Sequence, residues 1–466
     1  IQVRMLSDKA VNEIVPEAVR AYDERVDDRY MAERGGFWRG EFWGKWVLSA
    51  VAACRYNGSP ELRQTIRDAV DGLLATQDDN GYIGTYHDSA FVRTEGKNMC
   101  WNVWCRKYTL WGLIEAADLL ADDHVLDAAV RFLDQTIAEL DDDIVTTGKL
   151  HGQPSTSILT PVVMLYRRTG APRFLAWAEH IVDQWAQHPD GPPDIFRQGL
   201  AGRPLHQWFP EHENWIKAYE FVSCVEGLVE LYRVTGRQDY LQAARNIYDD
   251  VVAHERLILG GISDNDRMDR APLKPDTITE VCDAVYWSRL GFQLLCLTGE
   301  QKYADEIERT LYNNLCAGMN AAGDWGVRRL ALTGEHWPAP QHCGLEHHHC
   351  CVANLPRGLL QAIKTAVMTG PGDDTVTVNL YLPGQADVHL PAGRVRLQTQ
   401  TDYPLGGDVR LRLELDQPTA FTLRLRIPPW SKETKLSVNG EDVAAAPGAG
   451  AEITRTWHNG DDVLLE

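Results

Sequence analysis

The sequence predicts a mainly helical protein with a β domain, in which an α/α toroid is followed by an antiparallel β-sandwich. Two observations carry this prediction. A helical hairpin unit recurs over the first part of the chain, and short alternating strands fill the last part. A chain of 466 residues also exceeds what one hydrophobic core usually serves, so two domains are expected.

The repeated unit consists of a helix end, a turn with glycine, and a second amphipathic helix. It occurs in "LYRRTGAPRFLAWAEHIVDQW" from 165, "LYRVTGRQDYLQAARNIYDDVV" from 231 and "LCLTGEQKYADEIERTLYNNL" from 295, with an earlier relative from 54. The glycine stands where a helix C-cap needs positive φ, and apolar residues then recur at helical spacing. Such repeats predict helix pairs that close into a ring, with a pocket at the centre where the long loops converge.

From about residue 375 the pattern changes to short alternating runs such as "TVTVNLYLPG", "DVRLRLELDQ" and "AFTLRLRIPPW". Gly, Pro and Asn-Gly turns separate these runs, which is typical of an antiparallel sandwich. We therefore predict a helical catalytic domain over residues 1–373 and a sandwich over residues 374–466. Because the last run, "GDDVLLE", ends abruptly, the sandwich is expected to be incomplete.

Charge and composition restrict the classes of partner that the protein is expected to bind. The formal net charge is -20 at pH 7, which disfavours nucleic acid and acidic membrane surfaces. No run of apolar residues is long enough for a membrane span. The ten cysteines mostly stand in apolar helical contexts, which indicates free thiols and predicts a cytoplasmic protein.

Residues suited to chemistry gather in "GLEHHHCCVANLPRGLL", residues 344–360. Adjacent cysteines such as Cys350 and Cys351 rarely form a disulfide with each other, because the ring would strain the peptide bond between them. Three explanations of the pair remain, which are inert packing, disulfides to distant cysteines, and metal ligation. The stretch is polar, precedes a helix and crowds metal-capable side chains together, which favours ligation.

Zinc needs about four nitrogen, sulfur or oxygen ligands in a tetrahedron. Glu280 and Cys282, in "DTITEVCDAVYW", could join Cys350 and Cys351. Cys343 or the histidines at 347–349 could equally serve, and spacing alone does not choose among them.

Several motifs together carry a resemblance to a known family. They are "TEVCDAVYWSRLGFQLLCLTGEQKYADEIERTLYNNLCAGMN", "HHHCCVANLPRGLL", "VNLYLPG", "TDYPLGGDVRLRL" and "LRLRIPPWSKETKLSVNG". From "GEFWGKWVLSAV" onward, the chain resembles glycoside hydrolase family 127, the β-L-arabinofuranosidase family, and its close relatives. The resemblance implies an (α/α)6 barrel, which is a toroid of six helix pairs, followed by β-sandwich domains. It also implies one Zn²⁺ held by Glu280, Cys282, Cys350 and Cys351, with Cys350 as the nucleophile.

The implied activity is an exo-acting, retaining glycosidase that takes a small saccharide or glycoconjugate. Zinc coordination deprotonates and positions a thiol that is otherwise mostly protonated at neutral pH. Cys350 would attack the anomeric carbon, and water would release the sugar from the thioglycosyl intermediate with net retention.

The family's acid/base is a glutamate in a loop after a Gly-Gly-Ile or Gly-Gly-Val turn. This chain has the turn in "LGGISDNDRMDRAPLKPDTITE", but no Glu precedes Glu280 there. Asp266, followed by Arg267, matches best, with Asp264 and Asp269 as rivals. A solvated acidic loop is the competing interpretation.

The sugar-binding positions of the family differ more in this chain. In "PSTSIL", a His and two Glu of the family are replaced by Ser155, Ser157 and Leu159. In "NWIKAYEF", a second His is replaced by Asn214, and in "KYTLWGLIEA" a Gly-His pair is replaced by Leu110 and Trp111. A retained metal and nucleophile with replaced sugar contacts predicts an altered sugar specificity.

New substrate contacts are predicted mainly in "KNMCWNVWCRKYTLWG" and in loops that precede barrel helices. An aromatic platform beside a cation could stack a sugar face and bind a carboxylate, although Trp at helical spacing is more often core. The platform residues are Trp101, Trp104, Arg106, Lys107 and Tyr108, and the loop candidates are His151, His212, Glu213, Asn214, Lys217, His347, His348 and His349.

Two other functions fit the same sequence. A polysaccharide lyase on this fold would use Tyr108, Tyr219 or His212 to abstract a proton next to a uronate carboxylate. A non-catalytic carbohydrate-binding protein would carry a purely structural zinc. The sequence leaves the oligomeric state open, with a homodimer as the form considered.

Overall fold

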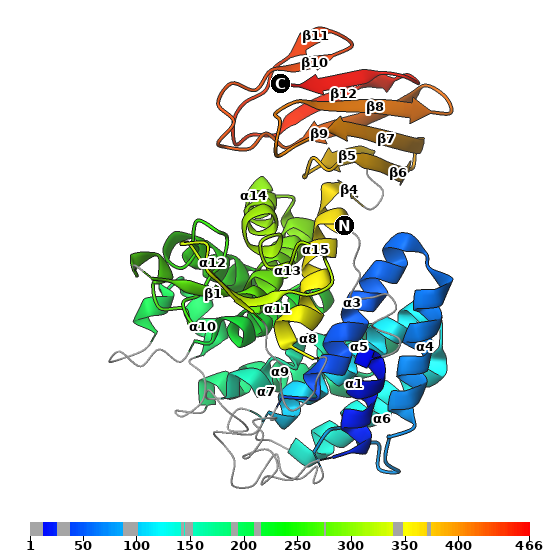
Figure 1. The fold of residues 1–466 in the computed structure, drawn as a ribbon, viewed down its shortest axis with the longest axis vertical. Coiled ribbons are helices and arrows are strands. Elements are labelled where there is room, and N and C mark those ends of the chain that lie inside the picture. Colours follow the sequence, from blue (N-terminus) through cyan, green and yellow to red (C-terminus); the bar gives the residue numbers. More distant parts are fainter. Residues whose placement is uncertain are drawn as a thin grey trace. The chain divides into compact units, whose positions relative to one another are not determined.

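The computed structural model describes residues 13–25, 38–86, 101–140, 144, 152–187, 194–208, 216–274, 276–338, 348–370 and 374–466. The chain divides into two compact units. The first comprises residues 1–290 and 312–359, and the second comprises residues 291–311 and 360–466. Most helices belong to the first unit and most strands to the second (Figure 1).

The helices of the first unit alternate between an inner ring and an outer layer. The inner ring consists of α3 (Glu41–Asn57), α5 (Asn102–Leu120), α8 (Leu159–Thr169), α11 (Ala218–Thr235) and the first parts of α13 (Val281–Thr298) and α15 (Cys350–Ala366). The outer layer consists of α1 (Val15–Asp23), α4 (Pro60–Leu74), α6 (Asp123–Leu140), α9 (Pro172–Gln187) and α12 (Gln238–His254). Short pieces are α7 (Gln153–Thr156), α10 (Ile195–Leu200), η5 (Leu205–Gln207), η6 (Ala271–Leu273) and the π-helical η7 (Leu311–Leu315).

The pattern of buried residues distinguishes the inner ring from the outer layer. Nearly every residue of α5 and α11 is buried, whereas α6 and α12 bury one face and expose the other. Along the ring, α3 contacts α5, α5 contacts α8, and α8 contacts α11. Ser49 of α3 donates a hydrogen bond of 2.8 Å to the Ala353 carbonyl of α15, so the last inner helix lies beside the first (Figure 1). The predicted α/α toroid is confirmed.

The glycine turns of the repeat end the inner helices as predicted. Gly170 and Gly236 have φ of 65° and 69°, and their N–H groups bond the carbonyls of Tyr166 and Tyr232. A residue with a Cβ is disfavoured in this left-handed conformation, so glycine stops the helix and starts the return.

A second glycine effect brings α3 close to α5. A Cβ on Gly44 would lie 2.1 Å from the Tyr108 carbonyl oxygen, so only glycine permits this approach. The close packing places Glu41 and Lys45 of α3 against the aromatic side chains of α5.

A small sheet in the first unit presents the segment before α13. The strand β1 (Ile278–Glu280) pairs antiparallel with β2 (Val327–Ala331), which pairs with β3 (His336–Pro338). Glu280 lies opposite Arg329 in the register and immediately precedes α13.

The second unit contains the β-sandwich. Its strands are β4 (Val367–Thr369), β5 (Thr375–Val378), β6 (Gly384–Leu390), β7 (Gly393–Thr401), β8 (Val409–Leu415), β9 (Thr419–Leu425), β10 (Leu436–Val438), β11 (Glu441–Val443), β12 (Ala451–Trp457) and β13 (Asp462–Leu465). One sheet has the order β11-β10-β13-β8-β7-β6 and the other β12-β9-β5-β4. These described strands pair antiparallel except β5 with β9, which is parallel. Alternate residues fill the core between the sheets, as the period of two predicts.

The second unit also includes α14 (Gln301–Thr310), although the sequence pattern places the domain change near residue 373. Buried Arg426 explains the difference. It pairs with Asp305 of α14 at 2.7 Å and with Glu308, and Glu308 also accepts a hydrogen bond from Tyr403. None of the helices in the described part of the chain combines the length and apolar character that a bilayer span requires.

Candidate metal centre

Four side chains predicted as ligands lie together in the first unit. Glu280 ends β1, Cys282 is in the first turn of α13, and Cys350 and Cys351 begin α15. Their ligand atoms all lie within 4.8 Å of one another. The Cys351 sulfur is 3.2 Å from Glu280 Oε1 and 3.8 Å from the Cys350 sulfur. Residues some seventy positions apart in sequence thus converge on one point.

Two helix N-termini direct their positive ends at this group. Thiolates are favoured near the first turn of a helix, where backbone N–H groups have no partner inside the helix. The Cys351 N–H instead donates to His349 Nδ1 at 3.1 Å, which fixes how the chain enters α15. His349 thereby supports the cysteine pair rather than joining the four ligand atoms.

Burial makes the group unstable as a set of free anions. Glu280, Cys282 and Cys351 are exposed by 4%, 1% and 0%, and Cys350 by 9%. Burial and the neighbouring acidic groups raise the pKa of Glu280, Cys282 and Cys351 well above their usual ranges. A divalent cation would supply the missing positive charge. Three sulfurs and one carboxylate oxygen suit zinc, whereas magnesium and calcium prefer oxygen ligands throughout.

Asp266, the predicted acid/base, contacts this group. It has a φ of 71° and receives a hydrogen bond of 2.8 Å from Arg329 Nη2. Burial opposes its ionisation, but the hydrogen bond to Glu280 and the charges of Lys217 and Arg329 outweigh burial and hold the pKa of Asp266 well below its usual range. In this carboxyl pair, Asp266 is the ionised member while Glu280 keeps the proton. Ionisation of Glu280 as a metal ligand would remove that hydrogen bond and favour protonation of Asp266, as an acid/base requires.

The rival aspartates have other partners. Lys274 lies 3.2 Å from Asp264 and 3.0 Å from Asp269. Asp264 also accepts the N–H of Ile278 and so anchors the loop to β1. These two carboxylates stabilise the loop that presents Asp266.

Comparison with known proteins decides the family. The catalytic-domain profile of the GH127 β-L-arabinofuranosidases matches residues 3–362. The chain belongs to glycoside hydrolase family 127. The middle-domain profile of the same family matches residues 375–466.

Similar proteins show how much of the family's length is present. The chain is 24% identical over 436 residues to the non-reducing end β-L-arabinofuranosidase of Bifidobacterium longum subsp. longum, covering 85% of this chain and 65% of that relative. A GH127 β-arabinofuranosidase structure superposes with a TM-score of 0.79 at 21% identity, over 98% of this chain and 77% of that one. The GH127 β-L-arabinofuranosidase from Geobacillus stearothermophilus T6 gives 0.75 at 21% identity, over 98% and 79%.

In this GH127 chain the predicted aromatic platform lies inside the ring. Trp104 is 2% exposed and Tyr108 is fully buried. The Trp104 indole N–H donates to Glu41, and the hydroxyls of Tyr108 and Tyr219 share a hydrogen bond. Lys45 lies over the rings of Trp104, Tyr108 and Tyr219. The aromatic residues thus form a wall of the toroid interior.

Two predicted substrate contacts lie away from this wall. The Arg106 guanidinium is buried and binds Glu139 of α6 at 2.7 Å. His348 Nε2 donates a hydrogen bond of 2.8 Å to the Ile14 carbonyl, and the ring stacks on Phe42. The structure therefore places Arg106 between two helices and His348 against the N-terminal segment, because each finds its partners there.

Three other predicted contacts, His151, His212 and Asn214, lie outside the described residues, as do Glu213, Cys343 and His347.

Glu41 and Lys45 were not among the residues predicted from the sequence. Their side chains are buried and form an ion pair of 3.0 Å. Burial raises the pKa of Glu41, Lys45 opposes this, and the Cys350 sulfur adds to it. Glu41 is thus a buried carboxyl group close to the predicted nucleophile. A Glu and a Lys four positions apart inside the apolar "GEFWGKWVLSAV" were the available signal.

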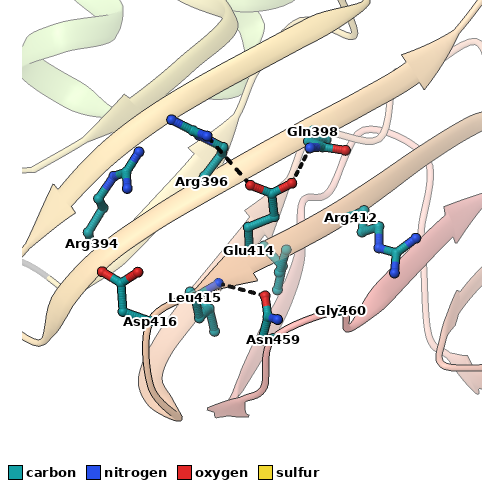
Figure 2. Close-up of a pocket in the computed structure, with 10 residues that line it drawn as sticks. Arg394, Arg396, Gln398, Arg412, Glu414, Leu415, Asp416, Asn459 and Gly460 are labelled. Atoms are coloured by element: carbon teal, nitrogen blue, oxygen red, sulfur yellow. Dashed lines mark hydrogen bonds and ion pairs between the residues drawn. The ribbon is translucent and has the colours of Figure 1, made fainter.

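A surface hollow of about 480 Å³ lies in the second unit, on the face of the sheet that contains β7 and β8 (Figure 2). Arg394 and Arg396 project there but both bind Asp387, and Glu414 bonds Arg396 and Gln398. Because these charges satisfy one another within the sheet, we assign no ligand to this hollow.

Proposed function

We propose that this GH127 chain is a zinc-dependent, exo-acting, retaining glycosidase with Cys350 as its nucleophile. The observation that carries the proposal is the buried group of Glu280, Cys282, Cys350 and Cys351 at the start of two inner helices. When bound, zinc would compensate the charge of these ligands and lower the pKa of their thiols. The similar β-L-arabinofuranosidases support a glycoside as the substrate.

Cys350 is the most exposed of the three cysteine residues, which favours it as the one that meets the substrate. Its sulfur forms a bond to the anomeric carbon while the bond from that carbon to the leaving oxygen breaks, and the oxygen takes a proton. Water then attacks the anomeric carbon, loses a proton to a base, and displaces the sulfur. Two inversions give net retention.

Two described carboxyl groups could transfer these protons. Asp266 is the proposed acid/base because it matches the family's loop and contacts the ligand group. Glu41 is the alternative, because the Cys350 sulfur contributes to the rise of the Glu41 pKa and the Glu41 side chain accepts a hydrogen bond from Trp104. In both positions the carboxyl group stands beside the cluster that carries the nucleophile.

The sugar specificity is proposed to differ from β-L-arabinofuranose. Ser155, Ser157 and Leu159 stand at positions where the family has charged or imidazole side chains, and all three are buried at the start of the α7–α8 segment. The Ser157 hydroxyl donates to the Pro154 carbonyl at 2.6 Å, so it is already engaged within the protein.

The lyase alternative gains no support from the described residues. A tyrosine base must ionise, but burial raises the pKa of both Tyr108 and Tyr219 well above the usual range.

The test is a screen of p-nitrophenyl furanosides and pyranosides with the full chain reconstituted with zinc. We expect turnover of at least one exo-glycoside, and NMR during early turnover should show a product with the configuration of the substrate. An inverted product would rule out the Cys350 intermediate, and an unsaturated product absorbing in the near ultraviolet would indicate a lyase.

The acid/base is identified by Asp266→Asn and Glu41→Gln. The variant of the true acid/base should lose about 10²- to 10⁴-fold in kcat with a poor leaving group and much less with dinitrophenolate, which leaves without protonation. The other variant should lose similar activity on both substrates or little on either. If neither variant depends on the leaving group, both assignments are wrong.

A further inference from the structure

The interior of the first unit contains two cationic side chains that have no ionic partner among the described residues. Lys107 of α5 is fully buried, and Arg357 of α15 is 7% exposed. Neither the Lys107 ammonium nor any guanidinium nitrogen of Arg357 forms a hydrogen bond with a described residue. A buried, unpaired charge is strongly unfavourable in a protein interior. Arg357 keeps its charge, whereas Lys107 can either lose its proton or be held charged by a bound anion, so the two side chains together favour a counter-ion or a bound group.

The neighbouring carboxylates do not supply that charge, because each already has a cation. The pairs are Glu41 with Lys45 at 3.0 Å, Glu220 with Lys217 at 2.9 Å, and Glu226 with Arg289 at 2.7 Å. Lys107 and Arg357 therefore leave this part of the described interior with an excess of positive charge.

The two cations share one aromatic wall. Lys107 Nζ lies 5.0 Å from the centroid of the Tyr286 ring, and Arg357 Cζ lies 5.6 Å from the same centroid. Aromatic faces attract cations but do not neutralise them. The Tyr286 hydroxyl and Asn354 Oδ1 also have no hydrogen-bond partner among the described residues. Unsatisfied polar atoms and two cations thus surround the same place.

This place lies beneath the metal centre along α15. Arg357 comes about two helical turns after Cys350, and helical side chains lean back toward the N-terminus. Asn354, between them in sequence, donates to the Tyr219 hydroxyl at 3.2 Å. A spacing of seven residues places Cys350 and Arg357 on the same face of α15.

We propose that Lys107 and Arg357 form a binding site for a carboxylate-sized anion beneath the metal centre. The anion is either the acid group of a saccharide, which makes acidic glycosides the substrate class and rests on the proposed function, or a free small anion held in the toroid. Guanidinium and ammonium groups together suit a carboxylate, since one offers a planar pair of donors and the other a point charge. Burial lowers the pKa of Lys107 to about 7, so a bound anion also restores its charge.

The first experiment is calorimetric titration of the full chain and of Cys350→Ser with galacturonate, galactose and acetate. Galacturonate binding without galactose binding assigns the anion to the saccharide. Equal binding of galacturonate and acetate assigns a free anion. Because galacturonate, galactose and acetate have no glycosidic bond to cleave, the result does not depend on turnover, and failure of the glycosidase proposal leaves this test intact.

The variants are Lys107→Met and Arg357→Met, with exposed Arg63→Met as the control that removes the same charge elsewhere. We expect each interior variant to weaken anion binding about 10- to 100-fold and the control to leave it unchanged. Removing an unpaired buried charge should not unfold the protein, so the denaturation midpoint without anion should stay level or rise.

Unchanged binding in both interior variants, or no binding of any anion to the wild type, overturns the proposal. If a variant fails to fold, the wild-type protein alone tests the proposal. Its urea midpoint must rise with galacturonate or acetate concentration, since a ligand that binds only the folded state stabilises it.

Discussion

Replacing Cys350 by serine should reduce kcat by at least about 10⁴-fold, because a hydroxyl beside a metal centre is a far weaker nucleophile than a thiolate. The chain should still fold, since the two side chains have nearly the same shape, but it should hold zinc less tightly because Cys350 is also one of the four proposed ligands. Single-turnover kinetics on the best substrate of the screen measures the loss, and mass spectrometry of the quenched wild type should detect a sugar bound to the peptide that contains Cys350.

The matched control is Cys351→Ser, which loses a ligand but keeps the proposed nucleophile. Excess zinc should partly restore Cys351→Ser and leave Cys350→Ser inactive. If Cys350→Ser keeps wild-type turnover, Cys350 is no nucleophile and the zinc is structural. The non-catalytic interpretation also predicts wild-type saccharide binding by Cys350→Ser, but it predicts no turnover by the wild type.

The second large effect concerns the metal itself. The purified wild type should contain about one zinc per chain, and Cys282→Ser should contain far less, because a tetrahedral site loses one of its four ligands. Since metal binding stabilises only the folded state, the variant should also melt several degrees lower. Elemental analysis and thermal denaturation, each before and after chelation, measure the two effects.

Cys296→Ser is the control for this prediction, because Cys296 is an exposed cysteine on α13, the helix that also contains Cys282. It should keep its zinc and its melting temperature. A wild type that binds no zinc, or a Cys282→Ser variant that keeps a full equivalent, would contradict the ligand assignment.

Local patterns predicted the repeating parts of the fold well. The turns at Gly170 and Gly236 depend on one residue each, and the ring follows from repeating them. The parallel pairing of β5 with β9 depends on a connection across the sandwich, so no alternating pattern within either strand could indicate it.

Side-chain direction was harder to predict than helix position. Arg106 and Lys107 are neighbours, but successive helical residues point about 100° apart, so one binds Glu139 of α6 and the other faces the toroid interior. Within the aromatic stretch, Lys107 lies over the Trp104 ring, and the choice between the two cations required the tertiary structure. The Arg329 partner of Asp266 comes from a distant strand and was likewise not predictable.

The closure of the ring has a consequence for biosynthesis. The hydrogen bond between Ile14 and His348 joins residues 334 positions apart, and the bond between Ser49 and Ala353 joins residues 304 positions apart. Contacts over such separations form late, because the intervening chain must be made and folded first. Cys282 therefore leaves the ribosome well before its partners at the start of α15, and the nascent chain carries an incomplete thiol set until the ring closes. Supply of the metal should consequently influence the yield of correctly folded protein as well as its activity.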